Sequence, residues 1–233
     1  MRRAAARVAG HLDAAGLNLV GVLSADRYDA IVPPAWRAAC VRPGARSALV
    51  AASGGRALWS ALQSSPELGQ SHDPVDTYTR RVTGALAETL TREGYPSAAL
   101  LAFQRRGGVY ADFVALGRAA GLGAPSRLGL LLHPVYGPWM SIRAVLLTAL
   151  VLPETPPLGD YDPCVGCPAP CAEACPGGAP APGGFDLARC DTTRSQEPGC
   201  ELNCAARRAC VVGTSHAYAD EAMAHHMAHA RPA

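Results

Sequence analysis

The chain contains no lysine, although it has 21 arginines among its 233 residues. A Schiff base to a substrate carbonyl and the phosphate-binding lysine of a Walker loop both need a lysine, so these two kinds of chemistry are excluded. Aromatic residues make up only 6% of the chain, and the formal net charge is +2 without a stripe of basic residues. The composition therefore gives no argument for a nucleic-acid partner.

Long apolar runs are also missing. The longest candidate, residues 144–152, is interrupted by Thr148 and is far too short to span a bilayer. His11 and Asp13 interrupt the apolar region that an export signal would need near the N-terminus. We therefore expect a soluble, cytoplasmic protein that does not associate with membranes, in a compartment where thiols stay reduced and can hold metal.

The chain has nine cysteines, and eight of them lie between Asp162 and Cys210. The first four have the spacing C-x2-C-x3-C-x3-C-P, which begins at Cys164 and ends at Pro176. The bacterial ferredoxin run is C-x2-C-x2-C-x3-C-P, and its fourth cysteine ligates the other cluster of a pair. The chain has this run with one extra residue between the second and third cysteines. Because eight thiolates divide into two sets of four, the pattern predicts two 4Fe–4S clusters.

We assign the eight cysteines to two ligand sets. Close cysteines on a loop can hold one face of a cube, and another ligand must come from a distant segment. The first cysteine set is Cys164, Cys167, Cys171 and Cys210, and the second cysteine set is Cys175, Cys190, Cys200 and Cys204. The ninth cysteine, Cys40, lies far from the run, and we expect it to be a buried structural thiol.

Three other interpretations of the cysteines stay open: a disulfide framework, structural zinc, and a single cluster with spare thiols. Disulfide scaffolds are typical of secreted chains, whereas no export signal is evident here. Zinc sites made only of thiolates usually show two separated C-x2-4-C knuckles instead of four cysteines in one run. Two clusters therefore explain the spacing best.

Helical and strand patterns alternate over residues 1–152 and predict an α/β domain. A proline-rich linker is expected at 153–163, a ferredoxin-like iron–sulfur domain with sparse regular structure at 164–218, and a terminal helix and tail at 219–233. Helices are expected at 2–15, 36–40, 57–62, 77–93, 112–120 and 219–230, and strands at 17–23, 45–52, 97–103, 128–133 and 139–150.

Three segments resemble epoxyqueuosine reductase: residues 117–123, residues 130–139 and the cysteine run. That family has an R-A-G-L-G segment, a P-x-x-G-S-W turn, and cysteines ordered as four in a run, one alone after an arginine, and three more. Here Arg189-Cys190 supplies the lone cysteine. The resemblance covers residues 112–210 and implies a nitroreductase-like α/β domain with an active cleft, followed by a ferredoxin-like domain that carries two 4Fe–4S clusters.

The resemblance also implies an oxidoreductase. The family uses cobalamin, fed by the clusters, to reduce an epoxide on a modified tRNA nucleoside, and an electron-donor protein of the ferredoxin or flavodoxin type is an expected partner. The leading hypothesis is a redox protein that passes electrons to a cofactor or substrate in the α/β cleft. The alternatives are a ferredoxin-like electron carrier or docking protein with no catalytic site of its own, and a cobalamin-dependent reductase.

The residues that should face the cofactor depart from the family pattern. The family segment W-x-G-K-N is replaced by residues 124–128, where Arg127 is the candidate to bind a cofactor phosphate. The aspartate of the family D-Y-H motif, which is its proton donor, falls at Thr77 when aligned on Tyr78. Asp76 is one residue away and is the candidate catalytic residue, or else a helix N-cap. We therefore expect weak or absent cobalamin binding, no epoxyqueuosine reduction by the chain alone, and little reason for a tRNA partner.

Overall fold

The computed structural model describes residues 2–229. Its contacts divide the chain into two units, which we describe separately. The first unit comprises residues 1–122 and 141–157, and the second comprises residues 123–140 and 158–233, within the described limits. The predicted tail at 231–233 and the last residue of the predicted terminal helix, Ala230, lie outside the described residues. Secondary structure of both kinds confirms the mixed α/β class.

A four-stranded sheet forms the centre of the first unit. Its order is β1-β2-β6-β3, with β1 at Leu19–Ser24, β2 at Ser47–Gly54, β6 at Met140–Thr148 and β3 at Ser97–Leu101. β1 is antiparallel to β2, and β3 is antiparallel to β6. All residues of β2 are buried, as expected for an inner strand that is covered on both faces.

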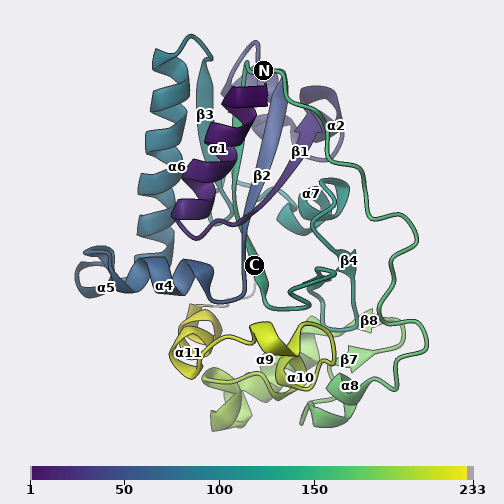
Figure 1. The fold of residues 1–233 in the computed structure, drawn as a ribbon. Helices are drawn as coiled ribbons and strands as arrows, with labels where there is room; N and C mark the ends of the chain where they lie inside the picture. Colours follow the sequence, from purple (N-terminus) through teal and green to yellow (C-terminus); the bar gives the residue numbers. More distant parts are fainter. Residues whose placement is uncertain (1, 230–233) are drawn as a thin grey trace. The chain divides into compact units, whose positions relative to one another are not determined.

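Three helices cover one face of this sheet: α1 (Arg2–Ala14), α4 (Ala57–Gln63) and α6 (Pro74–Arg92). Figure 1 shows α1 in front of the strands, with α6 beside it and next to β3. Val20 pairs with Ala51 and Val22 with Leu49, so these alternate strand residues share the face that the helices cover. The core between helices and sheet includes Val8, Leu12, Leu58, Leu62, Tyr78, Val82, Leu86 and Leu90.

The opposite face of β1 packs against a different set of elements. Gly21 points away from the α1 side, and a Cβ there would lie 2.2 Å from the carbonyl oxygen of Ala120, so a glycine permits this close approach. Ala120 follows α7 (Phe113–Ala119). The ring of Phe113 lies edge-to-face with that of Trp36 at 6.0 Å between centroids. This layer also contains α2 (Ala25–Asp29), the 3-10 helix η1 (Pro34–Trp36) and α3 (Ala38–Val41).

Most helices and strands predicted over residues 1–152 are confirmed, with two corrections. The long helix begins at Pro74 instead of Thr77 and is followed at its C-terminus by Glu93; the short α5 (Glu67–Gln70) precedes it. The strand expected at 128–133 is wrong except for β5 (Leu131–Leu132), which pairs with β4 (Ala124–Pro125) in the second unit. A turn takes positions 128–130, because Gly129 has φ +69° and its amide donates to the carbonyl of Ser126, and His133 forms an isolated β-bridge with Gly137.

The second unit contains short elements around the cysteines. These are β7 (Pro180–Ala181), β8 (Gly184–Phe185), α8 (Pro170–Ala174), α9 (Leu187–Gln196), α10 (Ala205–Arg208), α11 (Asp220–His229) and the 3-10 helices η2 (Pro198–Glu201) and η3 (Thr214–His216). The expectation of sparse regular structure was wrong for 187–196, which is helical and has Asp186 as its N-cap. No helix in the described part of the chain has the length and apolar character needed to cross a bilayer.

Candidate metal centre

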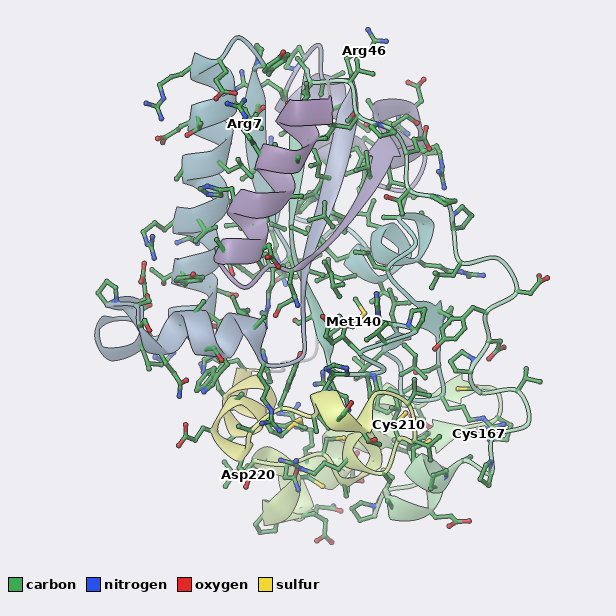
Figure 2. The ribbon with its side chains drawn as sticks, viewed as in Figure 1. Arg7, Arg46, Met140, Cys167, Cys210 and Asp220 are labelled. Atoms are coloured by element: carbon green, nitrogen blue, oxygen red, sulfur yellow. The ribbon has the colours of Figure 1, made fainter. Side chains whose placement is uncertain are left out.

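All nine cysteines of the chain are free thiols in the structure. Eight of them belong to the second unit, where Figure 2 labels Cys167 and Cys210 and draws sulfur atoms in yellow. The ninth, Cys40, is exposed, so the expected buried structural thiol is wrong. The reason is the short α3, where Ala38 is buried and the next two side chains turn toward solvent.

The first cysteine set lies partly in an apolar cluster of the second unit. Cys171, on α8, and Cys210, which follows α10, are each 8% exposed and pack with Leu128, Leu132 and Ala206. Burial raises the pKa of the Cys171 thiol, and the neighbouring Cys164 and Cys167 raise it further. Burial also raises the pKa of Cys210, and three thiols act in the same direction: Cys171, Cys164 and Cys167. The four members of the set are therefore close enough to influence one another.

The second cysteine set is distributed over four elements and is half-buried throughout. Cys175 ends α8, Cys190 lies in α9, and the last two members are Cys200 in η2 and Cys204 at the start of α10. Burial raises the pKa of Cys190, as do Cys204 and Cys175 to a smaller extent. Burial raises the pKa of Cys200 too, and the neighbours that add to this shift include the same two thiols.

Two short helices join the two sets. α8 carries Cys171 of the first set and has Cys175 of the second as its C-cap. α10 has Cys204 of the second set as its N-cap and is followed by Cys210 of the first. α8 and α10 pack against each other. The fold thus places one member of each predicted set at or beside each helix, and the ferredoxin run shares cysteines between two clusters in the same way.

Thiols are the donors that the second unit offers to a metal ion or a cluster. Within residues 2–229, no group of three or more His, Cys, Asp or Glu side chains is arranged to hold one metal ion. A 4Fe–4S cluster takes four thiolates, each on a different iron, so its ligands lie farther apart than those of one ion. The two predicted sets of four thiols match this donor set in number and type. The assignment of individual ligands stays a prediction.

Arg207 was missed by sequence reasoning, and it anchors α10. It is only 9% exposed, and its Nε donates to the carbonyl oxygen of Pro138 at 3.0 Å. Its guanidinium lies over the rings of Trp139 and Tyr218, 5.3 and 4.7 Å from their centroids. These contacts hold the helix between Cys204 and Cys210 against the segment 138–140. Two adjacent arginines between cysteines, Arg207 and Arg208, gave no sequence signal for this role.

The predicted catalytic candidate Asp76 lies in the first turn of α6 but is not its N-cap. The carboxylate of Asp73 accepts a hydrogen bond of 3.0 Å from the Asp76 amide, so the cap is Asp73. Asp76 instead faces Arg143, with 3.9 Å between Oδ1 and Nη1. The expectation of an N-cap at Asp76 is therefore wrong by three residues. Its catalytic role stays a prediction.

The predicted cofactor-binding residue Arg127 lies in the second unit, on the turn between β4 and β5. Its side chain is half-buried. The turn is held by the Ser126 hydroxyl, which donates to the carbonyl of Leu130 at 2.7 Å and accepts from the Leu128 amide at 3.2 Å. The arrangement presents an arginine on a well-defined turn, whereas Asp76 belongs to the first unit.

Comparisons with known proteins identify the fold of the chain but not its family. No family model and no curated protein matches the chain. The structure is similar to epoxyqueuosine reductase, with a TM-score of 0.64 and 15% identity over 94% of this chain and 68% of that one. A structure of the Bacillus subtilis epoxyqueuosine reductase gives 0.64 and 16% over the same shares. A catabolic reductive dehalogenase gives 0.53 and 19%, over 91% of this chain and 33% of that one. At these identities the likeness shows the fold alone.

Proposed function

We propose that the chain is an iron–sulfur oxidoreductase that holds two 4Fe–4S clusters and passes electrons to a cofactor or substrate. The observation that carries this proposal is the grouping of eight free thiols into two interacting sets of four, joined through α8 and α10. When bound, each cluster would supply reversible one-electron transfer. The similarity of fold to solved reductases supports the same class of activity.

The cysteine side chains would bind the clusters as thiolates. Because burial raises the pKa of Cys171, Cys190, Cys200 and Cys210, these groups are protonated thiols at neutral pH when nothing is bound. Binding must therefore displace protons, and loading should weaken as the pH falls. The buried Cys171 and Cys210 would shield one cluster from water, whereas the half-buried second set would leave the other nearer to solvent.

Anaerobic reconstitution followed by reduction tests this function. The proposal predicts a brown protein with broad visible absorption that accepts about two electrons per chain, one for each cluster, and returns them to an added acceptor. A colourless protein that binds zinc and accepts no electrons would contradict it. A corrinoid or flavin retained in equal amount with the chain would support a reductase over an electron carrier that only docks a partner.

Whether the chain binds cobalamin depends on the residues of the turn that carries Arg127. We propose weak or absent cobalamin binding, because residues 124–128 offer no tryptophan to pack on a corrin ring and no lysine for its phosphate. Arg127 is the group best suited to pair with that phosphate. Titration of cob(II)alamin into the reconstituted chain tests this: micromolar or tighter binding that is abolished by Arg127→Ala would instead favour the cobalamin-dependent reductase. An epoxyqueuosine reductase of similar fold has been solved with a tRNA stem loop, a partner shown for that protein.

A further inference from the structure

The 3-10 helix η2 presents an exposed apolar side chain between two cysteines of the second set. Leu202, the C-cap of η2, is 60% exposed and lies between Cys200 and Cys204 in the chain. Every residue of the segment 197–203 except Cys200 is exposed. A single exposed leucine is common on protein surfaces, so its place beside candidate cluster ligands is what matters here. We call residues 197–203 the η2 surface.

Hydrogen bonds hold the η2 surface in one conformation. The Cys200 amide donates to the carbonyl of Glu197 at 2.9 Å, and the Asn203 amide donates to the carbonyl of Gly199 at 3.0 Å. The side-chain oxygen of Asn203 accepts a hydrogen bond of 2.6 Å from Nε of Arg208. η2 also packs against α9 and α11. A surface that is ordered before contact loses little conformational entropy when a partner binds.

Two carboxylates flank the cysteine of η2. Glu197 and Glu201 are both exposed, and within the described part of the chain neither forms an ion pair with an arginine. Two arginines on adjoining helices are already engaged. Arg208 pairs with the carboxylate of Asp220 at 2.6 Å, and the half-buried Arg194 donates to a backbone carbonyl of α11. The charge that the η2 surface presents to solvent is therefore negative.

The first cysteine set lacks this combination of features. Val165, in the loop 164–167, is 78% exposed, but the carboxylate of Asp162 accepts a hydrogen bond of 2.9 Å from the Cys164 amide. The first set also contains two buried cysteines, whereas all four members of the second set are half-buried. Because electron transfer slows with distance, a partner exchanges electrons more readily with the cluster that lies nearer to the surface.

We propose that the η2 surface docks a small redox protein with a basic contact face, and that one electron passes between this partner and the cluster of the second cysteine set. The inference rests on the proposed function and adds where the partner binds and which charge it carries. When the partner is the donor, its redox centre loses one electron, the cluster gains it, and no bond forms or breaks. Glu197 and Glu201 speed association, and Leu202 lies at the centre of a small, transient contact.

Stopped-flow oxidation of the full chain tests the inference, with cytochrome c as the basic probe. The chain is reconstituted anaerobically and reduced with dithionite, and the excess reductant is removed. Each electron then leaves a cluster and reduces one ferric haem. The second-order rate constant should fall as salt is added, because salt screens the attraction between opposite charges. With the acidic cytochrome b5 as the contrasting probe, the rate constant should rise with salt.

Variants of the η2 surface separate charge from apolar contact. Combined Glu197→Gln and Glu201→Gln should lower the rate constant with cytochrome c about tenfold at low salt and little at high salt. Leu202→Ser should lower it about fivefold at both, because salt does not screen apolar contact. The matched control combines Asp160→Asn with Val165→Ser, two exposed positions near the first set, and should leave the rate constant unchanged.

Carbodiimide cross-linking gives a readout that requires no electron transfer. The reagent joins a carboxylate to an amine, and this chain has no lysine. Apart from its N-terminal amine, the chain can therefore be linked to cytochrome c only through its own carboxylates. Mass spectrometry of the product should find the links at Glu197 and Glu201. Links at Asp160 and Asp162 instead would place the partner at the first cysteine set and overturn the inference.

Iron analysis separates failure of the inference from failure of the proposed function. A wild-type chain that binds no iron–sulfur cluster contradicts the proposed function, and the inference with it. A chain that holds both clusters overturns the inference alone if its rate constant with cytochrome c does not depend on salt, or if combined Glu197→Gln and Glu201→Gln leaves that rate constant unchanged. Should a variant lose iron, the cross-links of the wild-type chain still decide.

Discussion

The first unit buries aliphatic side chains such as Leu12, Leu62 and Leu86 between helices and a sheet, whereas the core cluster of the second unit includes Cys171 and Cys210. The sequence charge differs as well: 15 arginines and 10 acidic residues fall in the first unit, and 6 and 9 in the second. An apolar core stabilises a unit by itself, but the smaller core cluster of the second unit, which includes two thiols, buries less apolar surface. This difference predicts that the stability of the second unit depends on what its cysteines bind.

Removal of the clusters should give the largest difference between the units. Anaerobic chelation of the reconstituted chain should make the backbone amides of α8, α9 and α10 exchange rapidly, because metal binding supplies folding free energy to such segments. The amides of β2 and α6 should keep their protection. Hydrogen exchange with mass spectrometry measures both regions in one experiment, and equal protection of the second unit with and without iron would contradict this dependence.

A cavity in the core of the first unit should have the opposite effect: it should destabilise the first unit and leave the clusters of the second in place. Leu62 is fully buried, so Leu62→Ala should lower the free energy of unfolding of the first unit by about 2–5 kcal/mol. The iron content of the folded chain should not change. Leu68→Ala is the matched control, because Leu68 is 39% exposed and should cost no more than about 0.5 kcal/mol. Denaturant titration measures both variants, and an equal cost for the two would contradict the assignment of the core.

Loss of the α6 N-cap should have a smaller effect, still confined to the first unit. Asp73→Ala removes the acceptor for the Asp76 amide and should cost about 1 kcal/mol of stability. Asp76→Ala removes a partly exposed ion pair with Arg143 and should cost less. Thermal unfolding of the two variants checks the order, and a larger loss for Asp76→Ala would place the cap where the sequence predicted it.

Replacement of the exposed Cys40 should have the smallest effect of these changes. Cys40→Ser should leave the iron content, the visible spectrum and the stability unchanged, because the side chain is exposed and belongs to the first unit. Iron analysis and a spectrum of the reconstituted variant suffice. Loss of the iron of one cluster on this change alone would mean that the two cysteine sets are wrongly assigned.

Periodicity predicted the first unit well, because its helices and strands bury regular apolar faces. The helix α9 was missed since it contains no buried residue and so has no apolar pattern to detect. The α6 start was misplaced although Asp73-Pro74 is a common way to begin a helix, with the proline at the first helical position. The strand expected at 128–133 failed because an apolar run was counted across Gly129, which adopts a positive φ.

Only part of the candidate site could be predicted from the sequence. The spacing of the cysteines sufficed to propose the two cysteine sets, because cysteines that bind clusters recur at short intervals in the sequence. It could not show which set is buried, because Cys171 and Cys210 pack on Leu128 and Leu132, distant in the sequence.

The iron content of the anaerobically reconstituted full chain tests the two-set account most directly. The account predicts about eight irons per chain, four for each cube, and about four when Cys200 and Cys204 are both replaced by alanine. A wild-type value of about four that the double replacement leaves unchanged would contradict it.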